Sequence, residues 1–378
     1  MGSSRVAELR EYGQNVWIDE IRREFFGSGE LDRMIDEDGV TGMTTNPSIF
    51  EKAIAGSDLY DSSIRALGAD GRSAEAIFDE LSWTDVREVA DRLKSVYQET
   101  DGLDGYVSIE VPAHLAYDAE RSIEEGVRIW NAVGRPNIFI KIPGTAEGIG
   151  AVRALIGRGI NVNVTLLFSQ EQYGAAARAY ARGLLDLHAG GGQPKSVYSV
   201  ASVFVSRIDT AVDAEIDRIL KSGGPEDGER PLGRLRGRAA VANCNVVYAA
   251  LNDWWSGPEF EEILELGGRK QPIVWGSTST KNPDYRDVKY VEDIIGPDTI
   301  NTVPKATIDL FRDHGEARAT LGTDYEGAKS VLEELEAGGV RLGEILENLQ
   351  RDGVAAFDQS YKHLLEVIEQ KKTALIAG

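Results

Sequence analysis

Short apolar runs alternate with longer amphipathic segments along almost the whole chain. Residues 137–142, for example, are apolar, rich in β-branched side chains and followed by a Pro-Gly pair, a pattern typical of a buried β-strand. On this basis we predict eight strands, at residues 14–19, 40–45, 105–111, 137–142, 160–167, 196–203, 271–277 and 298–303.

The segments between these runs carry helical patterns. Residues 73–99 predict two helices with a break near 82–84, and Ser169 and Gln172 have the spacing of a capping box at the start of another helix. Residues 204–270 are long enough for more than one helix. After the eighth strand we predict three further helices, near 323–337, 340–351 and 354–374.

Eight strands separated by helices predict an α/β fold, a parallel (β/α)8 TIM barrel with extra helices. An open doubly wound sheet is the main alternative, but its usual Gly-rich turn does not follow the first strand. Three helices exceed what one closing helix requires. We therefore expect one domain over residues 1–378, in which 320–378 form a C-terminal helical cap packed on the barrel.

Composition narrows the classes of function. The chain has 378 residues, 42% hydrophobic and 27% charged, as in ordinary globular proteins with a large core. The net charge of -21 argues against nucleic-acid binding, although a few local cations can still hold a phosphorylated small molecule. The single cysteine, Cys244, reads as a buried helix residue, and the four histidines are too scattered for a metal site. With no signal-like or membrane-length apolar segment, we expect a cytoplasmic protein without membrane association.

The most informative single residue is Lys141, which lies among Ile138, Phe139, Ile140 and Ile142. A lysine in a buried strand loses the hydration that its ammonium form needs, which favours the neutral amine. A positioned neutral amine can attack a ketone and form a Schiff base. A lysine there can also snorkel or pair with a buried carboxylate, and the run alone does not separate these readings.

Polar side chains recur at the carboxyl ends of the predicted strands, where barrel enzymes carry their active sites. Strands that are buried on both faces are usually almost wholly apolar, so these residues predict a convergent site. They are Asp19, Asn46, Glu110, Lys141, Asn163, Thr165, Ser202 and Ser277.

Taken singly, several of these residues have a structural explanation. Asp19 has the position of an N-cap for a helix that begins at residue 20, and Asn46 precedes a proline that suits a helix start. Glu110 has the character of a partner for a buried cation, and Thr165 that of a β-branched strand residue with its hydroxyl on the backbone. However, polar residues recur at the same end of strand after strand. A shared site explains this recurrence better than a separate structural role for each residue.

Four segments resemble the transaldolase family. Residues 42–50 (GMTTNPSIF) resemble its TTNPS signature, and residues 138–143 (IFIKIP) resemble the strand that carries its Schiff-base lysine. Residues 159–169 and 199–209 are similar to its fifth-strand and sixth-strand motifs. The matches come in family order over nearly the whole chain, and the length and tail resemble the longer actinobacterial and cyanobacterial members.

The resemblance implies a barrel of the class I aldolase type that uses no metal and no organic cofactor. It implies transfer of a dihydroxyacetone unit from sedoheptulose 7-phosphate to glyceraldehyde 3-phosphate, which gives erythrose 4-phosphate and fructose 6-phosphate. In this family, fructose 6-phosphate also serves as a donor and erythrose 4-phosphate as an acceptor. The pathway implied is the non-oxidative pentose phosphate pathway.

Four catalytic roles follow from the resemblance. Lys141 would attack the ketose carbonyl carbon, C2, to form the Schiff base. Glu110 would act through a water during formation and dehydration of the carbinolamine, and Thr165 would help to position that water. Asp19 would remove the proton of the C4 hydroxyl during cleavage and return it in the reverse step.

The resemblance also implies a set of substrate-binding residues. Thr45, Asn46 and Asn163 would hold the substrate or the enamine, and Ser202 with Arg207 has the family spacing for the phosphate pocket. An arginine can grip phosphate through two parallel hydrogen bonds. The alternative for Arg207 is a surface arginine on a helix.

The segment after the seventh strand departs from the family pattern. The family usually has a second phosphate-binding arginine there, whereas this chain reads Trp275-Gly-Ser-Thr-Ser-Thr-Lys281. We expect Lys281, with Ser277 or Ser279, to complete the phosphate site.

Three other functions compete with transaldolase. A fructose-6-phosphate aldolase would release free dihydroxyacetone, but such members are shorter and lack the tail. A non-catalytic sugar-phosphate-binding barrel needs no buried amine, and a sugar-phosphate isomerase needs no covalent lysine. An acidic surface without an apolar stripe fits a monomer or a weak homodimer.

Overall fold

The computed structural model describes residues 4–223 and 232–377 and contains a closed barrel of eight parallel strands. Each strand pairs with the next along the chain, and the eighth pairs with the first. The predicted barrel and all eight predicted strands are therefore confirmed. The strands are β1 (Gln14–Ile18), β2 (Val40–Thr44), β3 (Tyr106–Glu110), β4 (Ile138–Pro143), β5 (Val162–Leu167), β6 (Ser199–Phe204), β7 (Ile273–Gly276) and β8 (Thr299–Val303).

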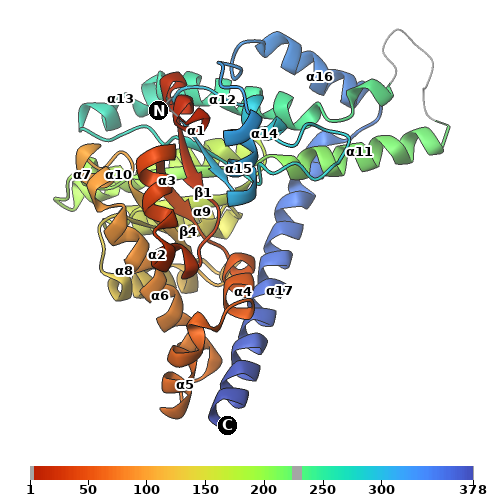
Figure 1. The fold of residues 1–378 in the computed structure, drawn as a ribbon. Coiled ribbons are helices and arrows are strands. Elements are labelled where there is room, and N and C mark those ends of the chain that lie inside the picture. The colour runs from red at the N-terminus through yellow and green to blue at the C-terminus, as the bar shows by residue number, and fades with distance from the viewer. Residues whose placement is uncertain (1–3, 224–231, 378) are drawn as a thin grey trace.

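Helices surround this barrel, with further helices at its edges (Figure 1). In the first half of the chain they are α1 (Arg5–Glu8), α2 (Glu24–Ser28), α3 (Glu30–Asp38), α4 (Pro47–Ala55), α5 (Asp61–Ala69), α6 (Ala74–Arg92), α7 (Lys94–Glu99), α8 (Ala119–Val133), α9 (Ala146–Ile156) and α10 (Gln170–Ala189). In the second half they are α11 (Ser206–Lys221), α12 (Ala239–Trp255), α13 (Pro258–Glu265), α14 (Lys289–Glu292), α15 (Lys305–His314), α16 (Tyr325–Ala337) and α17 (Leu342–Ala377). None of the helices within the described ranges is long and apolar enough to cross a membrane.

Two predicted helix breaks are wrong. Residues 73–99 do form two helices, but the break lies at Leu93, because Ser82 bonds back to the Asp79 carbonyl and the helix continues. Residues 340–351 and 354–374 form one continuous helix, α17. Gly353 lies inside this helix and does not end it. A Cβ at this position would lie 2.8 Å from Leu166 Cδ2. Glycine is thus present for a close approach of the helix to the barrel.

Other local predictions hold. Ser169 and Gln172 form both hydrogen bonds of the capping box at the start of α10. Residues 204–270 contain α11, α12 and α13, and Cys244 is buried in α12.

Inward side chains close the amino end of the barrel with aromatic rings. Trp17, Tyr106, Phe139 and Tyr198 pack together there, and the rings of Tyr106 and Phe139 lie 4.2 Å apart between centroids. Gly42 of the neighbouring strand makes room, since a Cβ at this position would lie 2.5 Å from the Trp17 ring. This end of the barrel is a packed core rather than a site for a ligand.

The inward positions become polar toward the carboxyl end. Side chains on one face of a strand recur every second residue. Tyr106 is accordingly followed by Ser108 and Glu110, and Phe139 by Lys141. The barrel therefore has an apolar base and a polar mouth, as expected for an enzyme of this architecture.

The long helix α17 runs beside α4 and past the carboxyl end of the barrel (Figure 1). Ser360 lies 2.7 Å from Ser48 on α4, and His363 lies 2.8 Å from Glu51 on the same helix. Further along, Lys371 donates to Asp61 on α5. The predicted C-terminal helical cap is therefore present and packs on the barrel helices that flank the mouth.

Candidate active site

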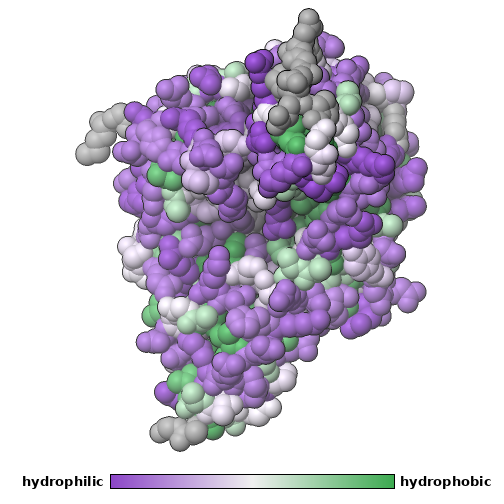
Figure 2. Space-filling view, turned by 90° about the vertical axis from the view of Figure 1, so that its right-hand side faces the viewer, coloured by the Kyte–Doolittle hydropathy of each residue, from purple (hydrophilic) through white to green (hydrophobic). Residues whose placement is uncertain are grey.

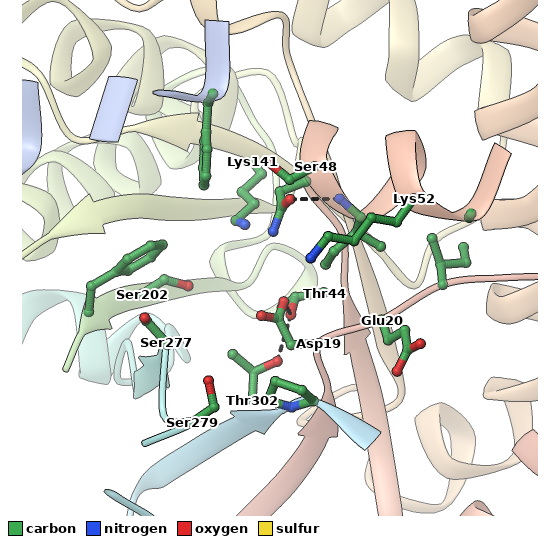
Figure 3. Close-up of a pocket in the computed structure, with 18 of the residues that line it drawn as sticks. Asp19, Glu20, Thr44, Ser48, Lys52, Lys141, Ser202, Ser277, Ser279 and Thr302 are labelled. Carbon is green, nitrogen blue, oxygen red and sulfur yellow. Dashed lines mark hydrogen bonds between the residues drawn. The ribbon is translucent and has the colours of Figure 1, made fainter. Parts of the chain in front are cut away.

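A cavity of about 500 Å³ opens at the carboxyl end of the barrel. Figure 3 shows the side chains of Asp19, Lys52 and Lys141 on one side of this space and Ser202, Ser277 and Ser279 on the other. The cavity is lined by many of the predicted site residues, namely Asp19, Asn46, Lys141, Ser202, Arg207, Ser277 and Lys281. The other predicted residues, Thr45, Glu110, Asn163 and Thr165, are not part of this lining.

Lys141 is buried in β4, and its amine reaches the cavity. Its Nζ donates to the Thr45 carbonyl oxygen at 3.1 Å and lies 3.9 Å from Glu110 Oε2. Glu110 and Asn163 are its register partners on the two neighbouring strands, so the three residues lie side by side at one level of the barrel. The lysine thus has a buried carboxyl group beside it and faces a space that a substrate can fill, and its role as a Schiff-base amine stays a prediction.

Glu110 is a carboxyl group with an unusual protonation state. Burial, only partly offset by the charge of Lys141, raises its pKa to about 7. Neither of its oxygens, nor the buried hydroxyl of Thr165, has a hydrogen-bond partner among the described residues. Buried polar atoms nearly always have a partner, so these atoms are available to a reacting water or substrate. A carboxyl that is part ionised at neutral pH can both accept and donate a proton.

The raised pKa of Glu110 has a consequence for stability. The folded chain binds this proton more tightly than the unfolded chain, where the ordinary pKa of 4.5 applies, so the free energy of unfolding falls as the pH rises from about 4.5 to about 7. In Glu110→Gln this loss is absent. We expect the unfolding free energy of the variant to fall by on the order of 3 kcal/mol less than that of the wild type between pH 4.5 and pH 7. Denaturant titration below and above this pH range measures the difference. A variant with the pH dependence of the wild type would contradict the assignment.

Asp19 lies directly after β1. Thr44 donates to its Oδ1 at 2.6 Å, and Thr44 is itself 2.6 Å from the Thr302 hydroxyl. Burial raises the pKa of Asp19, while the charge of Lys141 and the Thr44 hydrogen bond lower it. The alternative role as an N-cap is wrong, because α2 begins only at Glu24, with Arg23 as its N-cap residue.

Asn46 has the predicted structural role and also a place in the cavity wall. Its Oδ1 accepts from the backbone N–H of Ile49 as the N-cap of α4, so its amide nitrogen remains for other contacts. The cap fixes the side chain, because a hydrogen-bonded N-cap has a defined conformation. A residue that starts a helix and faces the cavity is thereby held in position for a ligand.

A chain of hydrogen bonds fills the barrel interior beside Lys141. Asn163 accepts from the Ser202 hydroxyl at 2.7 Å and donates to Ser108 Oγ at 3.0 Å. Thr45 donates to the Ser108 carbonyl at 2.8 Å and offers its own carbonyl to Lys141. The side chains of Thr45 and Asn163 therefore bond to other parts of the barrel interior, between Lys141 and the serine that faces the cavity.

Arg207 stands at the start of α11 with its guanidinium unpaired. The group lies over the rings of Phe204 and Phe357, at 5.1 and 5.9 Å from their centroids. Within residues 4–223 and 232–377 no acceptor takes a hydrogen bond from it. Burial lowers the pKa of this guanidinium, which nevertheless stays charged. The helix start that carries Arg207 is tied to the end of β7, because the Ser206 N–H donates to the Ser277 carbonyl at 3.0 Å.

Two lysines join Arg207 on the cavity wall. Lys281 donates to Ser279 Oγ at 2.6 Å, and the nearby charges of Lys52 and Arg207 add to the burial that lowers its pKa. Lys52 comes from α4, and no carboxylate in the described part of the chain pairs with it. Three cations that have no carboxylate partner among the described residues give this part of the cavity wall a positive charge, which favours an anion such as phosphate.

Two residues of the cavity wall, Lys52 and Phe357, are not among those predicted from the sequence. A signal for Lys52 was present, because Lys52 follows Ser48 by one turn of the helix that begins after the TTNPS segment, so both share one face. No local signal marks Phe357, which reaches the cavity from α17.

The comparisons with known proteins agree with this geometry. A family model described as Transaldolase/Fructose-6-phosphate aldolase matches residues 16–368. The chain is similar to a protein named transaldolase from Trichodesmium erythraeum, at 41% identity over 373 residues and 98% of each chain. It is also similar to transaldolases from Mycolicibacterium paratuberculosis, at 41% identity over 97% of this chain and 96% of the relative, and from Thermobifida fusca, at 39% identity over 99% and 100%.

Proposed function

The chain belongs to the transaldolase/fructose-6-phosphate aldolase family, and we propose that it is a transaldolase that works through a Schiff base on Lys141. The reaction moves a dihydroxyacetone unit from sedoheptulose 7-phosphate to glyceraldehyde 3-phosphate and gives erythrose 4-phosphate and fructose 6-phosphate. One observation carries the proposal: the buried amine of Lys141 enters a cavity that also contains a carboxylate, Asp19, and three cations.

The first half of the reaction forms the covalent intermediate. The amine of Lys141 attacks C2 of the ketose, and the carbinolamine loses water to give an iminium ion. These steps need a group that both accepts and donates protons near the lysine. Glu110, with its pKa of about 7 and its Oε2 3.9 Å from Lys141 Nζ, has this property, and the free hydroxyl of Thr165 is suited to orient the water that relays the proton.

The second half breaks and makes the carbon–carbon bond. Asp19 takes the proton of the C4 hydroxyl, the C3–C4 bond breaks, and its electron pair moves toward the iminium to leave an enamine while the aldose departs. The enamine carbon then attacks the aldehyde of the acceptor, and Asp19 returns the proton to the new hydroxyl. Asp19 and Glu110 lie in different surroundings, which suits them to separate proton-transfer duties.

The cations would bind the phosphate at the far end of the sugar. Arg207 offers paired N–H donors, and Lys281 and Lys52 add charge from two other elements. Asn46 and Ser202 line the wall and present polar atoms to the hydroxyl groups of the substrate.

The function is tested by mixing fructose 6-phosphate with erythrose 4-phosphate and following formation of sedoheptulose 7-phosphate and glyceraldehyde 3-phosphate. Free dihydroxyacetone is measured in the same samples with and without the acceptor. We expect acceptor-dependent products and little free dihydroxyacetone. Release of dihydroxyacetone at the same rate without acceptor would instead identify an aldolase of the same family, and no turnover would reject both activities.

Removal of either cavity lysine is expected to weaken binding more than chemistry. In Lys281→Ala and in Lys52→Ala the KM for fructose 6-phosphate should rise roughly 10-fold, with a smaller change in kcat, because each amine acts as a point charge on the phosphate. The matched control is Lys329→Ala on the outer helix α16, where the lysine pairs with Glu333 and does not line the cavity. A fall in kcat with an unchanged KM would contradict the phosphate role.

We also propose that the protein acts in the cytoplasm as a monomer or weak homodimer. The face that carries α17 is mostly hydrophilic (Figure 2), and large exposed apolar side chains such as Leu103, Tyr117 and Tyr325 are dispersed along the chain. Sedimentation velocity over a range of concentrations tests the assembly state, and a stable larger oligomer would reject it.

A further inference from the structure

Among the residues that the structure describes, the guanidinium of Arg207 contacts two aromatic rings and makes no hydrogen bond. One ring, Phe204, belongs to the end of β6, only three residues before the arginine. The other, Phe357, comes from α17 and is distant in the sequence. A planar guanidinium stacks well on aromatic rings, and such stacking leaves its N–H groups free.

The placement of Phe357 depends on how α17 meets the barrel. About two helical turns before it, Gln350 donates from Nε2 to the carbonyl oxygens of Gly144 and Leu166, each at 3.0 Å. The Gly144 carbonyl directly follows β4, the strand that carries Lys141. The Leu166 carbonyl lies in β5, the strand that carries Thr165. Gly353, between Gln350 and Phe357, allows the helix to approach Leu166 closely, and a Cβ there would also lie 3.6 Å from Arg207 Nη1.

Without the ring of Phe357, the guanidinium of Arg207 could turn toward nearby carboxyl groups. Asp19 and Glu110 both attract its charge, as their effects on its pKa show. A guanidinium that turns toward these carboxylates would no longer face the phosphate end of the cavity. The ring from α17 therefore opposes a competing ion pair inside the site.

We propose that Phe357 is a positioning residue for phosphate recognition, which acts by holding the guanidinium of Arg207 against Phe204 with its donors free. The inference rests on the proposed function, in which the cavity receives sugar phosphates. It assigns the C-terminal helix a part in substrate selection, because Gln350 and Gly353 set the ring at the mouth of the barrel.

The test compares Phe357→Leu with Phe357→Tyr. Binding of inorganic phosphate is measured by calorimetry, and kcat/KM is measured for fructose 6-phosphate and for unphosphorylated fructose with the same acceptor. We expect Phe357→Leu to weaken phosphate binding and to lower the preference for the phosphorylated donor, each roughly 10-fold, through KM. Phe357→Tyr keeps the ring and should keep both values.

A matched variant separates positioning from helix docking. Ile368→Ala removes a buried apolar side chain further along α17 and should leave the phosphate preference unchanged. The proposal is overturned if Phe357→Leu binds phosphate like the wild type, or if both donors lose the same factor, since Phe357 would then act through Lys141, 6.0 Å from its ring centroid.

The proposed function fails on a different result. If the wild type shows no transfer and no release, that function is rejected, whereas the calorimetric comparison of phosphate binding still decides the role of Phe357.

Discussion

Replacement of Lys141 by Ala or Arg is expected to lower kcat by roughly 10⁴-fold or more and to abolish covalent trapping by borohydride. Lys141 is buried in a strand with a carboxyl oxygen 3.9 Å from its amine, whereas Lys52 lies on helix α4 and Lys281 in the segment after β7. The fold of Lys141→Ala should survive, because the pKa of Glu110 is already about 7, so loss of the neighbouring cation leaves this carboxyl protonated instead of charged and unpaired. The measurements are turnover, circular dichroism, and peptide mass mapping after incubation with fructose 6-phosphate and borohydride.

The control for this experiment is Lys281→Ala, which removes a lysine from the same cavity. It should still give an adduct of one dihydroxyacetone unit on Lys141. Transfer activity near that of the wild type in a folded Lys141→Ala protein would refute the Schiff-base assignment. An adduct on Lys52 or Lys281 in the wild type would move the chemistry to another residue.

Replacement of Asp19 by Asn should block cleavage of the C3–C4 bond, the step that follows formation of the imine on Lys141. The amide cannot take the C4 hydroxyl proton, so we expect kcat to fall roughly 10²-fold to 10⁴-fold while the imine still forms. The mass of the reduced adduct distinguishes the two steps. Wild-type enzyme traps the three-carbon unit, whereas Asp19→Asn should trap the intact ketose phosphate on Lys141.

Thr44→Val provides a graded comparison. It removes the 2.6 Å hydrogen bond to Asp19 but keeps the carboxylate, so its loss of kcat should be smaller. A normal kcat in Asp19→Asn, or a three-carbon adduct formed at the wild-type rate, would show that another group takes the proton.

Much of the fold follows from the sequence because strand and helix patterns are local. The eight apolar runs lie at the eight strands, and five of the eight polar residues at their ends line one cavity: Asp19, Asn46, Lys141, Ser202 and Ser277. The errors concern helix breaks, as at 82–84 and at Gly353. A break depends on what the helix packs against, and Leu166, which explains Gly353, is distant in the sequence.

The sequence by itself determined the barrel, the position of Lys141 on a buried strand and the set of polar strand ends, because two-residue and helical periodicities are local properties. Only the tertiary structure decided which of these groups face the cavity, how far Glu110 lies from Lys141, and that its carboxyl titrates near neutrality. It also brought Lys52 and Phe357 to the wall of the cavity from two separate helices. Closure of the barrel and the course of α17 set these contacts, and no pattern along the chain encodes a distance between residues so far apart.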